Sequence, residues 1–178
     1  HKPNRLDQWG AKAILALTGY GHFPIEHNRG HHVMVATPED PASARLGESV
    51  YRFALREIPG AAQRAIALER ERLARKGLPF WHWRNDILQS GALTLVIAVV
   101  LTAWLGPMVL LLLAIHHLVG WLQLTFANYV EHYGLLREKR PDGRYMPCEP
   151  RHSWNTNHIV SNLMLFHLQR HSDHHANP

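Results

Sequence analysis

Histidine is the residue type whose number and spacing in this sequence indicate chemistry. The chain has 15 histidines among 178 residues, and three segments are rich in them: "EHNRGHH", "NYVEHYG" and "LQRHSDHHA". Neutral imidazole is a good ligand for zinc, copper, iron and nickel. Imidazoles crowded on one surface repel one another when protonated and waste donors when buried, and metal ligation removes both costs. The three segments therefore predict a metal site.

The last segment places three histidines on one helix face. His171, His174 and His175 stand at positions i, i+3 and i+4, which are neighbours on a helix surface. The first segment supplies three more candidate ligands: His27, His31 and His32. Two such triplets predict a cage for more than one metal ion.

The other histidines have different expected roles. His132 follows Glu131 where a long apolar run ends, so we expect it level with the triplets and count it as a ligand. Three others are candidates for an outer shell that orients ligands: His22, His158 and His167. Those inside the apolar run, His116 and His117, are expected to line a cavity or to form hydrogen bonds. Those expected at an interface or surface are His82 and His152.

The element that must position these ligands is an apolar run. From Ile87 to Val130 there is no Asp, Glu, Lys or Arg, which as helix would measure about 66 Å. A bilayer core is only about 30 Å thick. We therefore expect two transmembrane spans, broken at Gly106-Pro107, and the alternative is a buried helical hairpin in a soluble bundle.

The flanks of this hairpin predict its orientation. "FWHWRND" precedes it and "EHYGLLREKR" follows it, so aromatic and basic residues gather on one side, as they do at a cytoplasmic membrane face. The net charge of +5 is then explained by a membrane surface, and no nucleic-acid readout motif is present. The single cysteine, Cys148, excludes a cysteine-ligated iron–sulfur cluster, so a redox protein of this sequence needs electrons from outside.

The rest of the chain predicts an all-α fold. We expect a charged helix over Pro59–Gly77 and another from about Asn157 onward, while Ala11–Phe23 is too short to span a membrane. The organisation predicted is one piece of a membrane helical bundle in three parts. These are a cytoplasmic-side region at 1–86, two spans at 87–130 and a second cytoplasmic-side region at 131–178.

These segments, with "HKPNRLDQW", "GYGHFPIEHNRGHHVMVATPEDPASARLGES" and "HSWNTNHIVSN", resemble the integral-membrane alkane monooxygenases. That family lies within a wider histidine-box group that includes xylene monooxygenase and acyl desaturases. The resemblance implies two irons held by nine histidines on the cytoplasmic side of a six-span bundle. The ligands that it implies here are His1, His27, His31, His32, His132, His171, His174 and His175.

The family's first box reads His-Glu-Leu-x-His-Lys, and only His1-Lys2 matches it here. We therefore expect this chain to be an internal fragment, without one ligand and about four upstream spans, and inactive by itself.

The activity implied is hydroxylation of a medium- or long-chain n-alkane at its terminal methyl. It uses O2 and electrons from rubredoxin, which rubredoxin reductase reduces with NAD(P)H, at the inner membrane of a bacterium. The expected docking residues for rubredoxin are Arg137, Lys139, Arg140 and Arg144. The acidic residues expected to orient ligands are Glu26, Glu131 and Asp173. The alternatives are a fatty-acyl desaturase, a xylene-type hydroxylase and, outside the enzymes, a histidine-rich metal transporter or sensor.

Overall fold

The computed structural model describes residues 5–164 and 168–176. Within them every regular element is a helix, apart from one isolated bridge between Lys139 and Tyr145, which confirms the all-α prediction. The elements in chain order are α1 (Arg5–Leu17), α2 (Phe23–Glu26), the π-helix η1 (His27–His31), α3 (His32–Met34), α4 (Val50–Ala74), α5 (Asp86–Leu105), α6 (Met108–His132), the 3₁₀ turn η2 (Pro150–His152), α7 (Ile159–Met164) and α8 (His171–Ala176).

The chain divides into two compact units. The hairpin unit comprises residues 1–27 and 61–123, and the histidine unit comprises residues 28–60 and 124–178. Helices α4 and α6 contribute residues to both units. Each unit is described below by itself.

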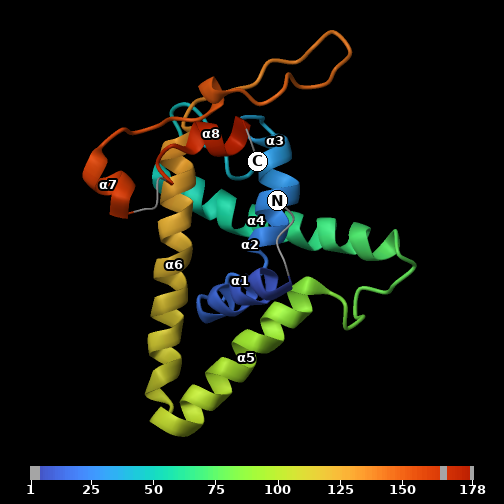
Figure 1. Cartoon of the computed structure of the whole chain (residues 1–178), viewed down its shortest axis with the longest axis vertical. Helices are drawn as coiled ribbons and strands as arrows, with labels where there is room; N and C mark the ends of the chain where they lie inside the picture. The colour runs from blue at the N-terminus through green and yellow to red at the C-terminus, as the bar shows by residue number, and fades with distance from the viewer. Residues whose placement is uncertain (1–4, 165–167, 177–178) are drawn as a thin grey trace. The chain divides into compact units, whose positions relative to one another are not determined.

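In the hairpin unit the apolar run forms two helices, as predicted. Helix α5 ends at Leu105, Gly106 turns the chain with a φ of 87°, and α6 begins at Met108 (Figure 1). A positive φ costs glycine little, and proline cannot continue the preceding helix. Both helices are long and apolar enough to cross a membrane, and only 6% of the most apolar stretch of each is buried.

Helix α1 lies against α5 (Figure 1). Its last turn is tied by two side-chain donors, because Thr94 Oγ1 donates to the Ala16 carbonyl at 2.9 Å and Trp121 Nε1 donates to the Thr18 carbonyl at 3.0 Å. Within α1, Lys12 Nζ lies 2.6 Å from Asp86 Oδ1. The start of α5 is thus held by an ion pair with Lys12, and its middle is held by the hydrogen bond from Thr94 to the end of α1.

The histidine unit packs α4 against the end of α6. Thr125 Oγ1 donates to the buried Glu57 carboxylate at 2.8 Å, and Asn128 Nδ2 donates to its other oxygen at 3.3 Å. Tyr129 donates its hydroxyl to the Glu48 carbonyl at 2.7 Å. Thr125, Asn128 and Tyr129 are spaced so that they lie on one face of α6. Their hydrogen bonds hold this face against α4 and the residues just before it.

Two helices differ from their predicted bounds. Helix α4 begins at Val50 and includes Pro59, because Ser49 Oγ accepts from the Arg52 backbone N–H at 3.4 Å and caps the helix upstream of the proline. The single helix expected from Asn157 onward is two helices, α7 and α8.

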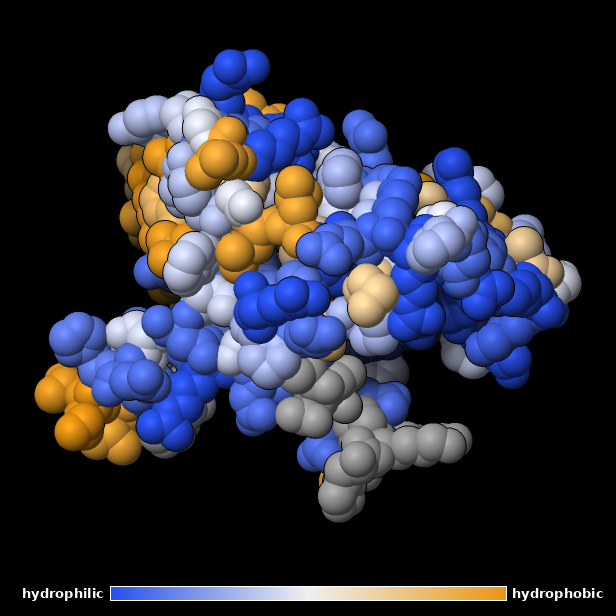
Figure 2. All heavy atoms as spheres, turned by 90° about the horizontal axis from the view of Figure 1, so that it is seen from above, coloured by the Kyte–Doolittle hydropathy of each residue, from blue (hydrophilic) through white to orange (hydrophobic). Residues whose placement is uncertain are grey.

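Helix α7 is short and exposes apolar side chains. The exposed fractions are 76% for Ile159, 71% for Val160, 65% for Leu163 and 73% for Met164. Figure 2 shows a mainly hydrophilic face on which hydrophobic side chains gather in several separate groups. A six-residue helix with so little of its apolar surface covered adds little to the core of the histidine unit.

Candidate metal centre

Four histidines of the histidine unit converge on one buried point. They are His31, His132, His171 and His175, with exposed fractions of 0%, 0%, 3% and 3%. Their candidate ligand atoms all lie within 4.8 Å of one another. The Nε2 atom of His175 lies 2.7 Å from Nε2 of His171 and 3.2 Å from Nε2 of His31.

Each of these rings stands at the end of an element or on one helix face. His31 is the last residue of η1 and His132 the last residue of α6. His171 and His175 are one turn apart on α8, so both rings point the same way. The i, i+4 spacing predicted this pair, whereas the meeting of α8 with the ends of η1 and α6 is a property of the fold.

The donor set fits a metal ion. Nitrogen ligands bound about 2.1 Å from one ion lie about 3 Å apart when they are at right angles, close to the observed separations of 2.7 and 3.2 Å. Burial, with repulsion from neighbouring rings, lowers the pKa of His171 to about 2 and lowers the pKa of His175 as well. Both rings are therefore neutral near pH 7, the form in which imidazole binds metals.

A second pair of histidines lies beside the first group. The ring of His32 is 4.6 Å, between centroids, from the rings of both His174 and His175. Burial lowers the pKa of His32 to about 4, and the pKa of His174 is lowered for the same reason. These two rings are also neutral near pH 7.

Two predicted ligands lie outside the histidine unit or outside the described residues. His27 is the last residue of the hairpin unit, where its ring stacks on Phe23 at a centroid distance of 4.7 Å. His1 lies outside the described residues, as does the outer-shell candidate His167.

Buried groups behind the rings hold two of the ligands. His31 Nδ1 lies 2.8 Å from Oδ2 of Asp40, and His132 Nδ1 donates to the His152 carbonyl at 3.2 Å. Both contacts direct Nε2 of the ring toward the cluster. Asp40 lies in the segment "TPEDPASARLGES", which reads as a plain turn, and no local pattern marks it as a partner of a histidine.

The predicted acidic partners occupy three different settings. Glu131 Oε2 lies 3.2 Å from Nε2 of His171, the nitrogen that faces the cluster, so this carboxylate is on the cluster side of the ring rather than behind it. Glu26 lies in the hairpin unit and accepts from Arg64 Nε at 3.0 Å. Asp173 is exposed on α8.

Several histidines lie away from the four-histidine group. His22 meets Tyr20 edge to face in the hairpin unit, and His158 is exposed at the start of α7. His117 Nε2 donates to the Leu17 carbonyl at 3.1 Å, a hydrogen bond of the kind expected for it. His152 is buried and accepts the Glu149 backbone N–H at 2.9 Å, although a position at an interface or surface was expected.

The basic loop after α6 contains one buried cation. Arg137 is 8% exposed and donates to the Val33 carbonyl at 2.6 Å and to the Met146 carbonyl at 3.3 Å. Its backbone N–H also donates to the Ala36 carbonyl. The exposed cations of this loop are Lys139, Arg140 and Arg144.

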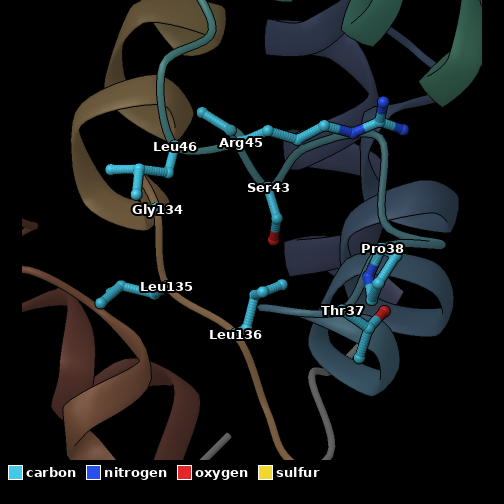
Figure 3. Close-up of a pocket in the computed structure, with 9 residues that line it drawn as sticks. Thr37, Pro38, Ser43, Arg45, Leu46, Gly134, Leu135 and Leu136 are labelled. Atoms are coloured by element: carbon cyan, nitrogen blue, oxygen red, sulfur yellow. The ribbon is translucent and has the colours of Figure 1, made fainter.

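Two hollows lie in the histidine unit. One, of about 330 Å³, is lined by residues 37–38, 43–46 and 134–136 (Figure 3). The other, of about 370 Å³, is mainly apolar, with walls that include Phe126 and Val130, and it also contains Glu131. Glu131 therefore lines an apolar hollow and also contacts His171 of the histidine cluster.

Comparison with known proteins gives one family and one set of relatives. Residues 1–178 match the sequence model of the family described as fatty acid desaturase. The chain is 60% identical over 178 residues to alkane 1-monooxygenase of Pseudomonas putida and 46% identical over 178 residues to alkane 1-monooxygenase of Acinetobacter baylyi. Over 175 residues it is 26% identical to the xylene/toluene monooxygenase hydroxylase component of Pseudomonas putida.

These matches cover 100%, 100% and 98% of this chain but only 44%, 44% and 46% of the relatives. The chain thus spans less than half the length of the relatives that it matches.

Proposed function

The chain belongs to the fatty acid desaturase family, and from this premise we propose that it carries the metal centre of a membrane monooxygenase acting on n-alkanes. The observation that supports this most strongly is the buried group of four histidines whose candidate ligand atoms lie within 4.8 Å of one another. The relatives at 60% identity carry the name alkane 1-monooxygenase, which favours hydroxylation over other reactions of the family.

Two irons are the metals that we propose. Imidazole suits several metals, iron among them, and the resemblance to the histidine-box alkane monooxygenases favours iron. The first ion would be held by His31, His132, His171 and His175. When bound, the irons would supply the binding and reduction of O2 and the transfer of one oxygen atom to a C–H bond.

The second ion would be held by His27, His32 and His174, with His1 as a further ligand. The pair His32 and His174 lies within the histidine unit, with ring centroids 4.6 Å apart.

The protein groups would keep the site dry and the rings neutral. Burial of the four histidines would exclude water, and burial lowers the pKa values of His171 and His175, which keeps these two rings neutral near pH 7. Glu131, beside the metal-facing nitrogen of His171, is placed to accept a proton or to approach an ion. The apolar hollow that ends at Glu131 would admit the methyl end of the alkane.

The membrane placement follows from α5 and α6. These helices would cross the bacterial inner membrane, and because His132 is the last residue of α6, the metal centre would lie at one membrane surface. The basic flanks favour the cytoplasmic surface. Rubredoxin, reduced by rubredoxin reductase and NAD(P)H, would dock on the exposed cations Lys139, Arg140 and Arg144.

The test is product analysis with the full-length gene product in whole cells. Fed with alkanes from about octane to hexadecane, the cells should form the primary alcohol of the same chain length, and His132→Ala should abolish it, whereas His82→Ala should not. The reaction consumes one alkane, one O2, two electrons and two protons, and gives one alcohol and one water.

A desaturase is the second candidate, because the matching family is described by that name. An alkene formed from an acyl chain, with no alcohol from any alkane, would replace our proposal with that activity. Purified protein that holds zinc and does not react with O2 and a reductant would favour a metal transporter or sensor.

A further inference from the structure

Asp40 is a buried carboxylate at the back of the metal centre. It is 1% exposed, and its Oδ2 atom lies 2.8 Å from Nδ1 of His31. The same oxygen accepts from Ser43 Oγ at 2.6 Å, while Oδ1 accepts from the Ala42 backbone N–H at 3.3 Å. A carboxylate removed from water is thus supplied with donors on both oxygens.

The hydrogen bonds of this group fix where each proton lies. The backbone N–H of Ala36 can only donate, so Ser43 Oγ accepts from it at 2.8 Å and turns its own hydrogen to Asp40. An ionised carboxylate only accepts. His31 must then carry a proton on Nδ1, so in the neutral ring the lone pair is on Nε2, 3.2 Å from Nε2 of His175.

From this geometry we infer that Asp40, held by Ser43, is a positioning residue that sets the tautomer and orientation of His31 and so controls how tightly the site retains its metal. The inference rests on the metal centre proposed above and deepens it. A carboxylate behind a ligating imidazole also raises the basicity of the ligand. In the other tautomer, Nε2 would present a hydrogen to the metal position.

The segment that carries Asp40 is fastened to the chain beyond α6. Ala36 adopts a φ of 55°, which is unusual for a residue other than glycine, and its carbonyl accepts from the Arg137 backbone N–H at 2.6 Å. The Gly134 N–H donates to the Ala44 carbonyl at 2.9 Å. Figure 3 shows the Ser43 hydroxyl facing the hollow between these two segments. The segment that carries Asp40 is therefore anchored on both sides of this residue, so its carboxylate can hold the His31 ring in one orientation.

The experiment measures iron release in the full-length, iron-loaded protein. Asp40→Asn keeps the shape of the side chain but removes its charge and offers a donor in place of an acceptor. We expect a chelator to remove iron about 10- to 100-fold faster than from wild type, with a changed Mössbauer spectrum. Ser43→Ala leaves Asp40 in place and should accelerate release less. Asp142→Asn, the same chemical change in an exposed loop, should release iron at the wild-type rate.

Wild-type release rate and an unchanged spectrum in Asp40→Asn would overturn the inference. If that variant does not fold, Ser43→Ala decides, and a wild-type rate there overturns it too. His31→Ala separates the two proposals. If this variant retains both irons, the proposed metal centre is wrong. If it loses iron while Asp40→Asn releases iron at the wild-type rate, only the role of Asp40 is wrong.

Discussion

The Nε2 atoms of His31 and His175 lie 3.2 Å apart, although 144 positions separate the two residues in the chain. One ring comes from the end of a π-helix and the other from the short helix α8. Two rings whose Nε2 atoms face each other at this distance are arranged to share one cation.

In the full-length protein, His31→Ala and His175→Ala should each lose at least one of two irons per chain. The double variant should lose little more than the worse single variant, because ligands of one ion act together. Elemental analysis of the purified proteins measures this, with His82→Ala as a control outside the cluster. Full iron content in either single variant would contradict a shared site.

Arg137 and Arg140 should differ in their contribution to stability. Arg137→Ala leaves the carbonyls of Val33 and Met146 without their donor in a buried place, so we expect a loss of about 2–4 kcal/mol. Arg140 is exposed, and Arg140→Ala should change stability by about 0.5 kcal/mol or less.

Thermal unfolding in detergent micelles measures the difference, and rubredoxin-dependent turnover measures docking separately. Equal stability of the two variants would show that the buried contacts of Arg137 contribute nothing.

Glu48 should stabilise the fold in a way that depends on pH. Arg56 donates to both of its oxygens, at 2.9 and 2.7 Å, and these bonds lower the pKa of Glu48 below its ordinary value of 4.5. The folded state therefore binds the proton more weakly than the unfolded state. The contribution of the pair is complete above about pH 4.5 and is lost as the pH falls through the lower, folded-state pKa.

We expect Glu48→Gln to cost about 1–3 kcal/mol at pH 7, and this difference from wild type should shrink below pH 4.5. The matched control is Glu71→Gln, which removes an exposed pair with Arg75 and should have little effect at any pH. A difference between Glu48→Gln and wild type that does not change with pH would argue against the ion pair.

Two glycines of the hairpin unit should respond to alanine in opposite directions. Gly19 has a φ of 63°, and a Cβ atom there would lie 2.8 Å from His117 Nδ1, so Gly19→Ala should destabilise by about 1–2 kcal/mol. Gly10 lies inside α1, where an added Cβ meets nothing within 4 Å, and Gly10→Ala should stabilise by about 0.5–1 kcal/mol. Chemical unfolding of both variants in micelles measures their free energies of unfolding. Equal changes in the two variants would contradict the prediction.

Much of the fold could be predicted from local patterns. The break at Gly106-Pro107 was confirmed, because a turn of this kind needs only neighbouring residues. The upstream start of α4 was missed, since Pro59 resembles a helix start when the cap at Ser49 is overlooked. The helix expected from Asn157 onward was wrong because polar spacing alone does not reveal a break between α7 and α8.

Residue types and short spacings by themselves determined that His171, His174 and His175 would share one helix face and that two apolar helices would form a hairpin. These features depend on helical periodicity, which acts over a few residues. The tertiary structure decided which histidines meet, that Asp40 stands behind His31, and that Arg137 is buried rather than exposed. Contacts of that kind depend on how distant segments pack, and no local pattern in the sequence encodes them.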